Sequence, residues 1–363
     1  MLRIGDRVKK IFSLLGEDID CILSIKRSNP NPTFSYITGL TRGFFEGSIA
    51  ICRREDKSVK LITSGLDKVE KDYIEVFIAN NQKKIKDEVK NLIRDCSVIG
   101  FDAKYTSFYD YKLIKRWTGG RKLRDISKGI LLSRLTKDDH ELKMIKRACK
   151  VSEKVFEELL NILREGISER EVASQIDFLV KEYGGDETAF KSIVAFGKNS
   201  AIPHHIPGNK KLKRNEIVLL DFGARYEGYV SDITRSFVYG RADDKVRRMF
   251  ETVLEAQDIG KRAIRGGTRF ETVHRRVFEF IEKTTFKGKF IHSTGHTIGL
   301  EVHDGFSLAK GTKEKFFDGV VFTIEPGIYL KSIGGIRIED DFVFQNGRVK
   351  RLTHAPIFLE TSS

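Results

Sequence analysis

The segment EIVLLDFGARYEGYVSDITRSF, residues 216–237, decides how the sequence is interpreted. Two apolar, β-forming runs flank a polar turn that contains glycine, which predicts a β-hairpin. If the turn centres between Tyr226 and Glu227, Asp221 pairs with Asp232 across the two strands. Like charges opposite each other destabilise a hairpin, and aspartate is a poor strand former. A divalent cation between the carboxylates would reverse that repulsion, whereas the simpler alternative is two solvent-facing aspartates beside a turn.

Downstream of this hairpin, three histidines fall within twelve residues. The run HSTGH at 292–296 leads into TIGLEVHD, which supplies His292, His296 and His303. A lone histidine is more often a structural residue than a ligand, but neutral imidazole is also the commonest nitrogen ligand of a transition metal. The density of histidines therefore marks this segment as a candidate site.

Two further carboxylates end or interrupt apolar runs. In VVFTIEPGIYL, Glu325 ends the run, and Pro326 and Gly327 stop the strand behind it. In GGIRIEDDFVF, residues 334–344, period-two alternation puts Arg337 and Glu339 on one strand face. The guanidinium is therefore placed to orient the carboxylate, with a surface ion pair as the alternative reading.

Taken together, these β segments supply four carboxylates and one imidazole. Such an oxygen-rich set suits a pair of divalent ions, with manganese or cobalt as the first choice and zinc or iron as alternatives. Four negative charges nearly balance two divalent cations, which leaves room for a bridging hydroxide.

The first 130 residues contain no histidine, and their pattern predicts a small α/β domain. Short apolar runs indicate strands at 21–25, 34–40, 47–53, 59–65 and 96–102. Residues 71–95 have apolar residues at helical spacing, and the boundary with the rest of the chain is expected near 120–136.

Residues 131–363 predict a second domain of α+β character. A long helix is expected after the capping-box pair Thr136 and Asp139, and a second after Ser168 and Glu171. Beyond these the chain is expected to form mainly strands, with one more helical segment around 243–283.

Composition narrows the class of protein. At 363 residues with 40% hydrophobic and 32% charged residues, the chain has the balance of a globular protein of two domains. No run approaches the roughly 20 apolar residues that span a bilayer, so we expect a cytoplasmic protein that does not interact with membranes. The net charge of +14 is scattered, which argues against nucleic acid as a partner. The four cysteines form no C-x-x-C pair and fit buried thiols.

These residues resemble those of the pita-bread metallopeptidases, which include methionine aminopeptidases, Xaa-Pro aminopeptidases and Xaa-Pro dipeptidases (prolidases). The resemblance spans nearly the whole chain and rests on these segments, in the family's order: SAIPHH at 200–205, LLDFGARYEGYVSDITRSF at 219–237, STGHTIGLEVHD at 293–304, TIEPGIY at 323–329 and GGIRIED at 334–340. It implies a pita-bread catalytic domain at 131–363. Residues 1–130, with the phrase FSYITGL, look like the creatinase-type domain of the Xaa-Pro branch.

The resemblance also implies the role of each site residue. Asp221 is expected to be a terminal metal ligand, Asp232 and Glu339 to bridge two ions, and His296 and Glu325 to complete the second site. Glu325 would also pass a proton to the departing nitrogen.

For the substrate, the resemblance implies that His204 and His303 contact it and its reacting carbonyl, and that His292 lines the pocket. The implied reaction is hydrolysis of the amino-terminal peptide bond before proline by a hydroxide shared between the ions. The implied partners are proline-containing peptides and a second copy of the chain, whose N-terminal domain would wall the site.

Three positions depart from the family's pattern. His205 stands where glycine is frequent and is left outside the catalytic set. Thr297 replaces a frequent glycine beside His296. Ser307 occupies the place of the arginine that holds the substrate carboxylate in many prolidases, with Lys310 as a possible substitute. Since a buried carboxylate without a cation is costly, an Xaa-Pro aminopeptidase is favoured over a strict dipeptidase.

Two other classes of protein remain as alternatives. One is a noncatalytic pita-bread binding protein, although such relatives lose metal ligands that are all present here. The other is an enzyme that acts on a small nonpeptide amide, as creatinase does. Creatinases lack the intact ligand set.

Overall fold

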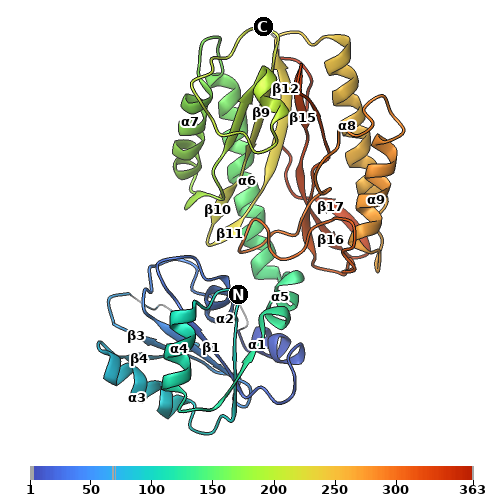
Figure 1. Ribbon diagram of the computed structural model, residues 1–363. Helices are drawn as coiled ribbons and strands as arrows, with labels where there is room; N and C mark the ends of the chain where they lie inside the picture. Colours follow the sequence, from blue (N-terminus) through green and yellow to red (C-terminus); the bar gives the residue numbers. More distant parts are fainter. Residues whose placement is uncertain (1–3, 68, 70, 362–363) are drawn as a thin grey trace. The chain divides into compact units, whose positions relative to one another are not determined.

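The computed structural model describes residues 4–67, 69 and 71–361. The chain forms two compact units, Met1–Arg134 and Leu135–Ser363 (Figure 1). Within the described residues, no helix combines the length and the apolar character that crossing a membrane requires.

The N-terminal unit is built on one six-stranded mixed sheet with the strand order β4-β3-β2-β1-β5-β6. Its strands are β1 (Cys21–Ile25), β2 (Ile49–Arg53), β3 (Val59–Thr63), β4 (Ile74–Ile78), β5 (Val98–Phe101) and β6 (Lys122–Asp125). Its helices are α1 (Ile4–Ser13), α2 (Pro32–Thr38), α3 (Gln82–Leu92), α4 (Phe108–Trp117) and α5 (Ser127–Leu135), the last ending at the boundary between the units. One core packs α3 and α4 against the sheet through residues such as Val89 and Leu113.

Two segments of this unit differ from their predicted structure. The run 34–40 was predicted as a strand but lies in helix α2, because Asn31 caps the helix, Pro32 occupies its first turn and Gly39 closes it with φ 69°. The predicted helix at 71–95 is strand β4 followed by α3, which begins after the Asn81 cap. In both cases the capping residues, rather than the apolar runs, set the element boundaries.

The C-terminal unit places its strands between two pairs of helices, as Figure 1 shows. Its helices are α6 (Asp139–Ile162), α7 (Glu169–Glu182), α8 (Asp244–Arg262) and α9 (Phe270–Ile281), and a 3₁₀ turn η1 spans Gly197–Ala201. Its strands are β7 (Glu187–Thr188), β8 (Ile193–Phe196), β9 (Glu216–Phe222), β10 (Ala224–Tyr226), β11 (Tyr229–Val230), β12 (Ile233–Tyr239), β13 (Val321–Ile324), β14 (Gly327–Leu330), β15 (Gly334–Arg337), β16 (Asp340–Gln345) and β17 (Arg348–Arg351).

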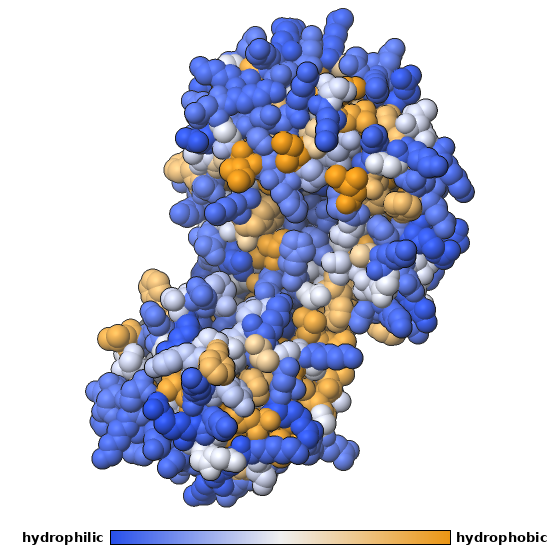
Figure 2. All heavy atoms as spheres, in the orientation of Figure 1, coloured by the Kyte–Doolittle hydropathy of each residue, from blue (hydrophilic) through white to orange (hydrophobic). Residues whose placement is uncertain are grey.

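Strands β9 and β12 are buried on both sides. One core packs α6 and α7 against β8, β9 and β12 through residues such as Phe156 and Leu220. A second core packs α8 and α9 against β14 and β15 through residues such as Val253 and Ile336. Polar side chains on these strands are therefore shielded from water. The face of this unit that is visible in Figure 2 is mainly hydrophilic, with several hydrophobic residues toward its middle.

The helix starts in this unit partly match the prediction. The capping box of Ser168 and Glu171 at α7 is confirmed. The predicted capping box of α6, Thr136 with Asp139, was wrong by two residues. The structure forms it from Asp138 and Glu141. The helical segment predicted around 243–283 is two helices, α8 and α9.

Candidate metal centre

The hairpin that presents the two aspartates has a different register from the predicted one. Asp221 pairs with Thr234, not with Asp232. The turn is centred on Glu227 and Gly228, both with positive φ (49° and 79°), as in the two-residue turns that match strand twist. Because this shifts the pairing by two residues, Asp232 lies diagonally from Asp221 rather than opposite it.

The other three predicted ligands come from the second half of the unit. His296 forms an antiparallel bridge with Ser307. Glu325 directly follows β13, and Glu339 lies between β15 and β16. A bridge between Thr234 and Glu339 joins this half to the aspartate hairpin. Residues more than 100 positions apart are thereby brought to one place.

Side-chain distances show how closely these groups gather. Ligand atoms of Asp232, His296 and Glu339 all lie within 4.8 Å of one another, and all three residues are buried. The Nε2 atom of His296 lies 3.5 Å from Asp232 Oδ2 and 3.4 Å from Glu325 Oε1. Asp221 lies close enough to this cluster for its negative charge to raise the pKa of both Asp232 and Glu339.

His296 is oriented as a metal-ligating imidazole would be. Burial lowers its pKa to about 3, so the ring is neutral at neutral pH. Its Nδ1 lies 3.4 Å from the carbonyl oxygen of Thr297, which is its hydrogen-bond acceptor if Nδ1 carries the proton. That tautomer directs the lone pair of Nε2 toward the carboxylates of Asp232 and Glu325, an arrangement that a cation between them would stabilise.

Three of the carboxylates each have one oxygen that the described chain leaves without a partner. Within the described residues, one oxygen each of Asp221, Asp232 and Glu339 is buried without a hydrogen-bond partner. Burial, followed by neighbouring negative charge, raises the pKa of Asp232 and of Glu339 well above the usual range. Burial raises the pKa of Glu325 to about 8. The chain alone leaves these acids poorly solvated as anions, and divalent cations would supply the missing charge.

Arg337 contacts a different carboxylate from the one predicted. Its guanidinium bonds the carboxylate of Asp221, and its Nε donates to Thr234 Oγ1 at 3.0 Å. Thr234 then donates to Glu339 Oε2 at 2.6 Å, so Arg337 reaches Glu339 through this hydroxyl. The Arg337 Nη1 group also donates to the hydroxyl of Tyr329 at 2.8 Å.

Sequence reasoning missed three residues that orient the ligands. Thr234 and Tyr329 belong to the network just described. The third is Asp341, whose Oδ2 accepts the backbone N–H of Asp232 at 3.0 Å. Thr234 follows Asp232 by two positions on the same strand face, a spacing that would have indicated its role once the register was known.

The three other predicted histidines differ in exposure. The ring of His303 lies against that of His296, with centroids 4.1 Å apart. His292 is half-buried, with Nε2 2.8 Å from the hydroxyl of Tyr329 and Nδ1 2.8 Å from the carbonyl oxygen of Ser293. Burial lowers its pKa to about 4, so it too is neutral.

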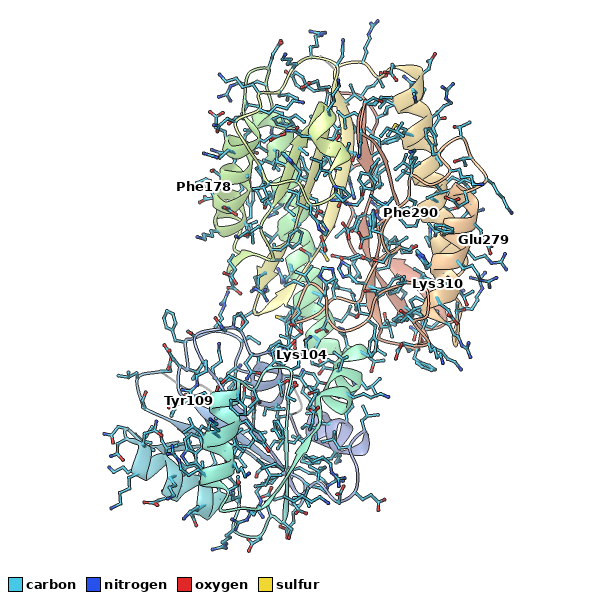
Figure 3. The ribbon with its side chains drawn as sticks, viewed as in Figure 1. Lys104, Tyr109, Phe178, Glu279, Phe290 and Lys310 are labelled. Carbon is cyan, nitrogen blue, oxygen red and sulfur yellow. The ribbon has the colours of Figure 1, made fainter. Side chains whose placement is uncertain are left out.

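His204 is exposed in the segment that follows η1. It lies close enough to Asp221, His292 and His303 for its charge to influence their pKa values. Exposed isoleucines adjoin two of these histidines in sequence: Ile202 and Ile206 flank His204, and Ile291 precedes His292. Phe290, labelled in Figure 3, packs its ring edge-on against His292.

The departures from the family's pattern have clear structural positions. Thr297 is buried, and its hydroxyl donates to the carbonyl oxygen of Asp304 at 2.9 Å. It therefore ties together the loop that carries His303. Ser307 pairs with His296 across an antiparallel bridge, and it places a neutral hydroxyl there instead of a cation. Lys310 is exposed further along the same loop (Figure 3).

Comparisons with known proteins agree with this geometry. The model of metallopeptidase family M24 matches residues 143–346. A curated relative from Pyrococcus furiosus, named Xaa-Pro dipeptidase, is 34% identical over 269 residues, which cover 74% of this chain and 76% of the relative. An Xaa-Pro dipeptidase from Pyrococcus horikoshii is 31% identical over 96% of this chain and 97% of its own length.

Solved structures show the same fold along the whole chain. The X-Pro aminopeptidase of Thermotoga maritima superposes with a TM-score of 0.88 at 32% identity, covering 97% of this chain and 99% of that one. The buried Asp, His and Glu cluster fits the divalent metal ions that a metallopeptidase requires. The chain therefore belongs to metallopeptidase family M24 and has the two-domain pita-bread fold of its Xaa-Pro peptidases.

Proposed function

We propose that this protein is a two-metal exopeptidase that hydrolyses the amino-terminal peptide bond preceding proline. The observation that carries the proposal is the convergence of five residues that could bind a metal, three of which have a buried carboxylate oxygen without a partner in the described chain. The names of the relatives support the choice of Xaa-Pro peptides as substrates.

In this proposal Asp221 would be a terminal ligand, Asp232 and Glu339 would be shared by both ions, and His296 and Glu325 would complete the second position. Manganese or cobalt fits this oxygen-rich set best, with zinc or iron as alternatives. When bound, two such ions would act as Lewis acids and lower the pKa of a shared water, which makes a hydroxide nucleophile available near neutral pH.

The chain's own groups would handle the protons. Glu325 is partly buried, and its Oε1 lies 3.4 Å from Nε2 of His296. It would accept the proton of the attacking water and deliver it to the departing proline nitrogen. His303, against the face of His296, would donate a hydrogen bond to the oxyanion that forms at the carbonyl.

The pocket histidines would position the peptide. His292 accepts from Tyr329 if its Nδ1 donates to the backbone, so its ring is fixed. His204 is exposed and free to contact the substrate. His204 would contact the substrate and His292 would line the pocket, while buried Arg337 holds Asp221 in place.

Ser307 favours an aminopeptidase over a strict dipeptidase. It lies opposite His296, where many prolidases have an arginine for the carboxylate of a dipeptide. A serine hydroxyl leaves that carboxylate without a countercharge, which is costly when it is desolvated. A longer peptide carries its terminal carboxylate away from this position and avoids the cost.

The direct test is hydrolysis of Gly-Pro, Ala-Pro and Ala-Pro-Ala by purified protein loaded with manganese or cobalt. We expect release of alanine from the tripeptide, with weaker turnover of both dipeptides. Turnover of the dipeptides alone would make the protein a prolidase. No hydrolysis of any of the three by metal-loaded protein would contradict the proposed function.

Replacing Ser307 with arginine should shift the specificity. We expect Ser307→Arg to raise kcat/KM for Ala-Pro by about tenfold relative to Ala-Pro-Ala, because a bidentate guanidinium matches the substrate carboxylate. Ser307→Lys is the matched control, since its flexible point charge is a poorer clamp and should give a smaller gain. An unchanged ratio in both variants would show that position 307 does not contact the terminal carboxylate.

A homodimer is part of the proposal. We expect the N-terminal unit of one subunit to wall the site of the other, as the resemblance to Xaa-Pro peptidases implies. Sedimentation equilibrium of the intact chain measures the mass directly, and a monomer that retains full activity would contradict this role of the N-terminal unit.

A further inference from the structure

Glu169, in the first turn of α7, is a fully buried carboxylate that binds one loop at several points. Its Oε1 accepts from the backbone N–H of Phe196 at 2.9 Å and from Asn199 Nδ2 at 2.8 Å. Its Oε2 lies 2.8 Å from His205 Nε2 and accepts from the backbone N–H of Gly208 at 3.0 Å. One carboxylate therefore contacts both ends and the middle of the segment Phe196–Gly208.

The same segment is fixed from two other directions. The backbone N–H of Arg170 donates to the carbonyl oxygen of Gly208 at 3.0 Å, which closes the loop onto the first turn of α7. On the other side, Ser200 Oγ accepts from the backbone N–H of Gly335 in β15, at 2.8 Å. The loop is thus held between α7 and the strand that leads to Arg337.

The charge state of Glu169 suits this role. Burial alone would raise its pKa, but the hydrogen bonds, of which that from His205 is the largest, lower it below the usual range. An ionised carboxylate has acceptor sites for all four donors, and a charged acceptor makes the stronger bonds. An amide at this position would turn a donor toward two other donors.

Two adjacent histidines of this loop have opposite surroundings. His204 is exposed and influences the pKa of Asp221 and His292. The side chain of His205 is only 15% exposed and pairs with Glu169, whose side chain is 0% exposed. His205 therefore contacts α7, whereas His204 remains exposed.

We propose that Glu169 and His205 are positioning residues that fix the loop Phe196–Gly208, so that His204 is presented to the substrate. The inference rests on the proposed function, because the contact of His204 with substrate is part of it. Position 205 carries this pairing in a place where the pita-bread peptidases often have glycine. The Glu169–His205 bond acts on substrate binding through His204 and takes no part in the bond-breaking step.

A series at position 205 tests this role. Glutamine places its amide nitrogen near the position of His Nε2, whereas asparagine reaches only the position of Nδ1. With Ala-Pro-Ala as substrate, we expect His205→Gly and His205→Asn to raise KM by about tenfold and to change kcat less than twofold. His205→Gln should restore KM to within about threefold of the wild-type value. Equal KM values for the glutamine and glycine variants, or a loss in kcat at unchanged KM, would overturn the proposal.

Hydrogen exchange gives a readout that is independent of activity. We expect the amides of Phe196 and Gly208 to exchange at least tenfold faster in Glu169→Gln, since both donate to this carboxylate. Glu171→Gln is the matched control on the same helix turn, because glutamine also completes a capping box. Unchanged exchange in Glu169→Gln would overturn the claim that Glu169 fixes this loop, even if the enzyme is active.

The two possible failures are distinguishable. If wild-type protein hydrolyses no Xaa-Pro peptide, the proposed function fails and with it the link from this loop to substrate. If hydrolysis is normal but the His205 series leaves KM unchanged, the positioning role alone is overturned. Should Glu169→Gln fail to fold, the His205 variants decide the question.

Discussion

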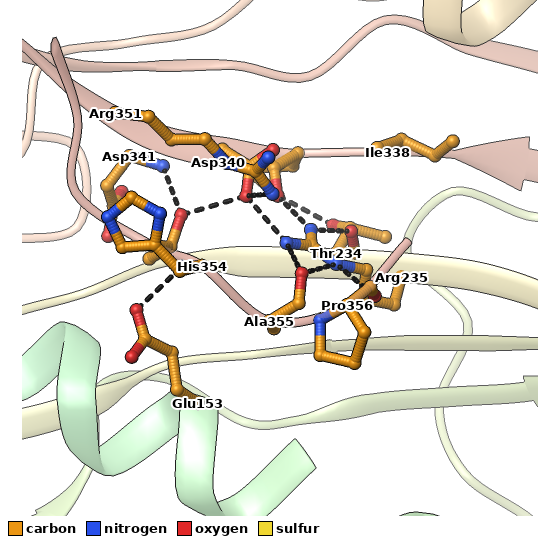
Figure 4. Close-up of polar contacts among 12 residues, drawn as sticks. Glu153, Thr234, Arg235, Ile338, Asp340, Asp341, Arg351, His354, Ala355 and Pro356 are labelled. Atoms are coloured by element: carbon orange, nitrogen blue, oxygen red, sulfur yellow. Dashed lines mark hydrogen bonds and ion pairs between the residues drawn. The ribbon is translucent and has the colours of Figure 1, made fainter. Parts of the chain in front are cut away.

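Glu339 and Asp340 are adjacent, equally buried acids in opposite surroundings. Asp340 Oδ1 accepts from Arg235 at 2.6 Å, from Arg351 at 2.8 Å and from the hydroxyl of Thr353 at 2.9 Å (Figure 4). Its Oδ2 accepts from the side-chain amide of Gln257 at 3.1 Å. Glu339 accepts one hydroxyl hydrogen bond, and its other oxygen is buried without a partner in the described chain.

The contrast shows how to distinguish a structural carboxylate from a ligand. Around Asp340 the chain supplies two guanidinium groups, so the acid is neutralised within the fold. Around Glu339, burial and the neighbouring acids outweigh the guanidinium of Arg337, so the pKa of Glu339 is raised and bound cations would supply the missing charge. The two regions are also connected, because Arg235 donates to the backbone carbonyl oxygen of Glu339 at 2.6 Å. The neutralised region therefore holds the backbone of the ligand region.

The largest effect is expected from neutralising the ligand region. Glu339→Gln should lower kcat/KM at least about a thousandfold and reduce metal content, because a carboxylate that we propose as a metal ligand is lost. Unfolding of the metal-free variant should cost as much free energy as that of the wild type, or more, because repulsion with Asp232 and Glu325 is relieved. Peptidase assays, elemental analysis and denaturant unfolding measure the three quantities.

Asp232→Asn serves as a parallel variant at the second carboxylate that we propose both ions would share. It should also remove activity and lower metal content. Normal metal occupancy with full turnover in either variant would contradict the assignment of these residues as ligands.

Neutralising Asp340 should lower the stability of the fold, whereas neutralising Glu339 should lower activity and metal content. Asp340→Asn leaves Arg235 buried without its charged partner, so we expect a loss of about 3–5 kcal/mol in the free energy of unfolding. The loss should be present in metal-free protein as well, which separates it from the effect at Glu339. Denaturant unfolding with and without manganese measures this loss. A variant as stable as the wild type would contradict the structural role of Asp340.

A smaller effect is expected from pH on the metal-free protein. The pKa of Glu325 is about 8 in the fold against an ordinary 4.5, so above pH 4.5 the native state retains a proton that the unfolded chain has lost. The free energy of unfolding should therefore fall as pH rises toward 8, by at most about 1.4 kcal/mol per pH unit for this group.

His292 and His296 act in the opposite direction below pH 6.5, because their pKa values are lowered to about 4 and about 3. The test is therefore made between pH 7.5 and 8.5, where both rings are almost entirely neutral in the native and the unfolded state. Chelator-treated wild type should lose stability with rising pH across this range, and Glu325→Gln should lose less. A flat profile in the wild type would contradict the raised pKa of Glu325.

The smallest effect is expected at the edge of the Asp340 region. Arg351 is 32% exposed, and Asp340 keeps its bond to Arg235 when Arg351 is removed. Arg351→Met should cost about 1 kcal/mol in the free energy of unfolding and leave kcat/KM within about twofold. A cost as large as that of Asp340→Asn would show that the two arginines are not separable.

The sequence predicted which residues converge better than how they are held. Asp221, Asp232, Glu325 and Glu339 stood out because each ends or interrupts an apolar run, and burial of such runs forces their acids together. The strand register was not recoverable from the apolar pattern, since a shift by two residues keeps the same side chains on the same face. Only the turn at Glu227 and Gly228 carries that information.

Partners across long sequence separations were also beyond the sequence. Arg337 lies two positions from Glu339, yet its guanidinium bonds Asp221, 116 residues away. Helix α2 was mistaken for a strand because the aromatic and β-branched residues of 34–40 favour strands, while the caps at Asn31 and Gly39 decide for a helix. Local spacing identifies faces and caps, and tertiary packing chooses the partners.

The central claim is that the carboxylates of this cluster, three of which have an oxygen without a partner in the described chain, hold a pair of divalent cations. Anomalous diffraction from crystals grown with manganese tests it most directly. We expect two peaks per chain among Asp221, Asp232, His296, Glu325 and Glu339, and none at the neutralised Asp340. A map with no peak at these five side chains, from protein shown to be folded, would contradict the account.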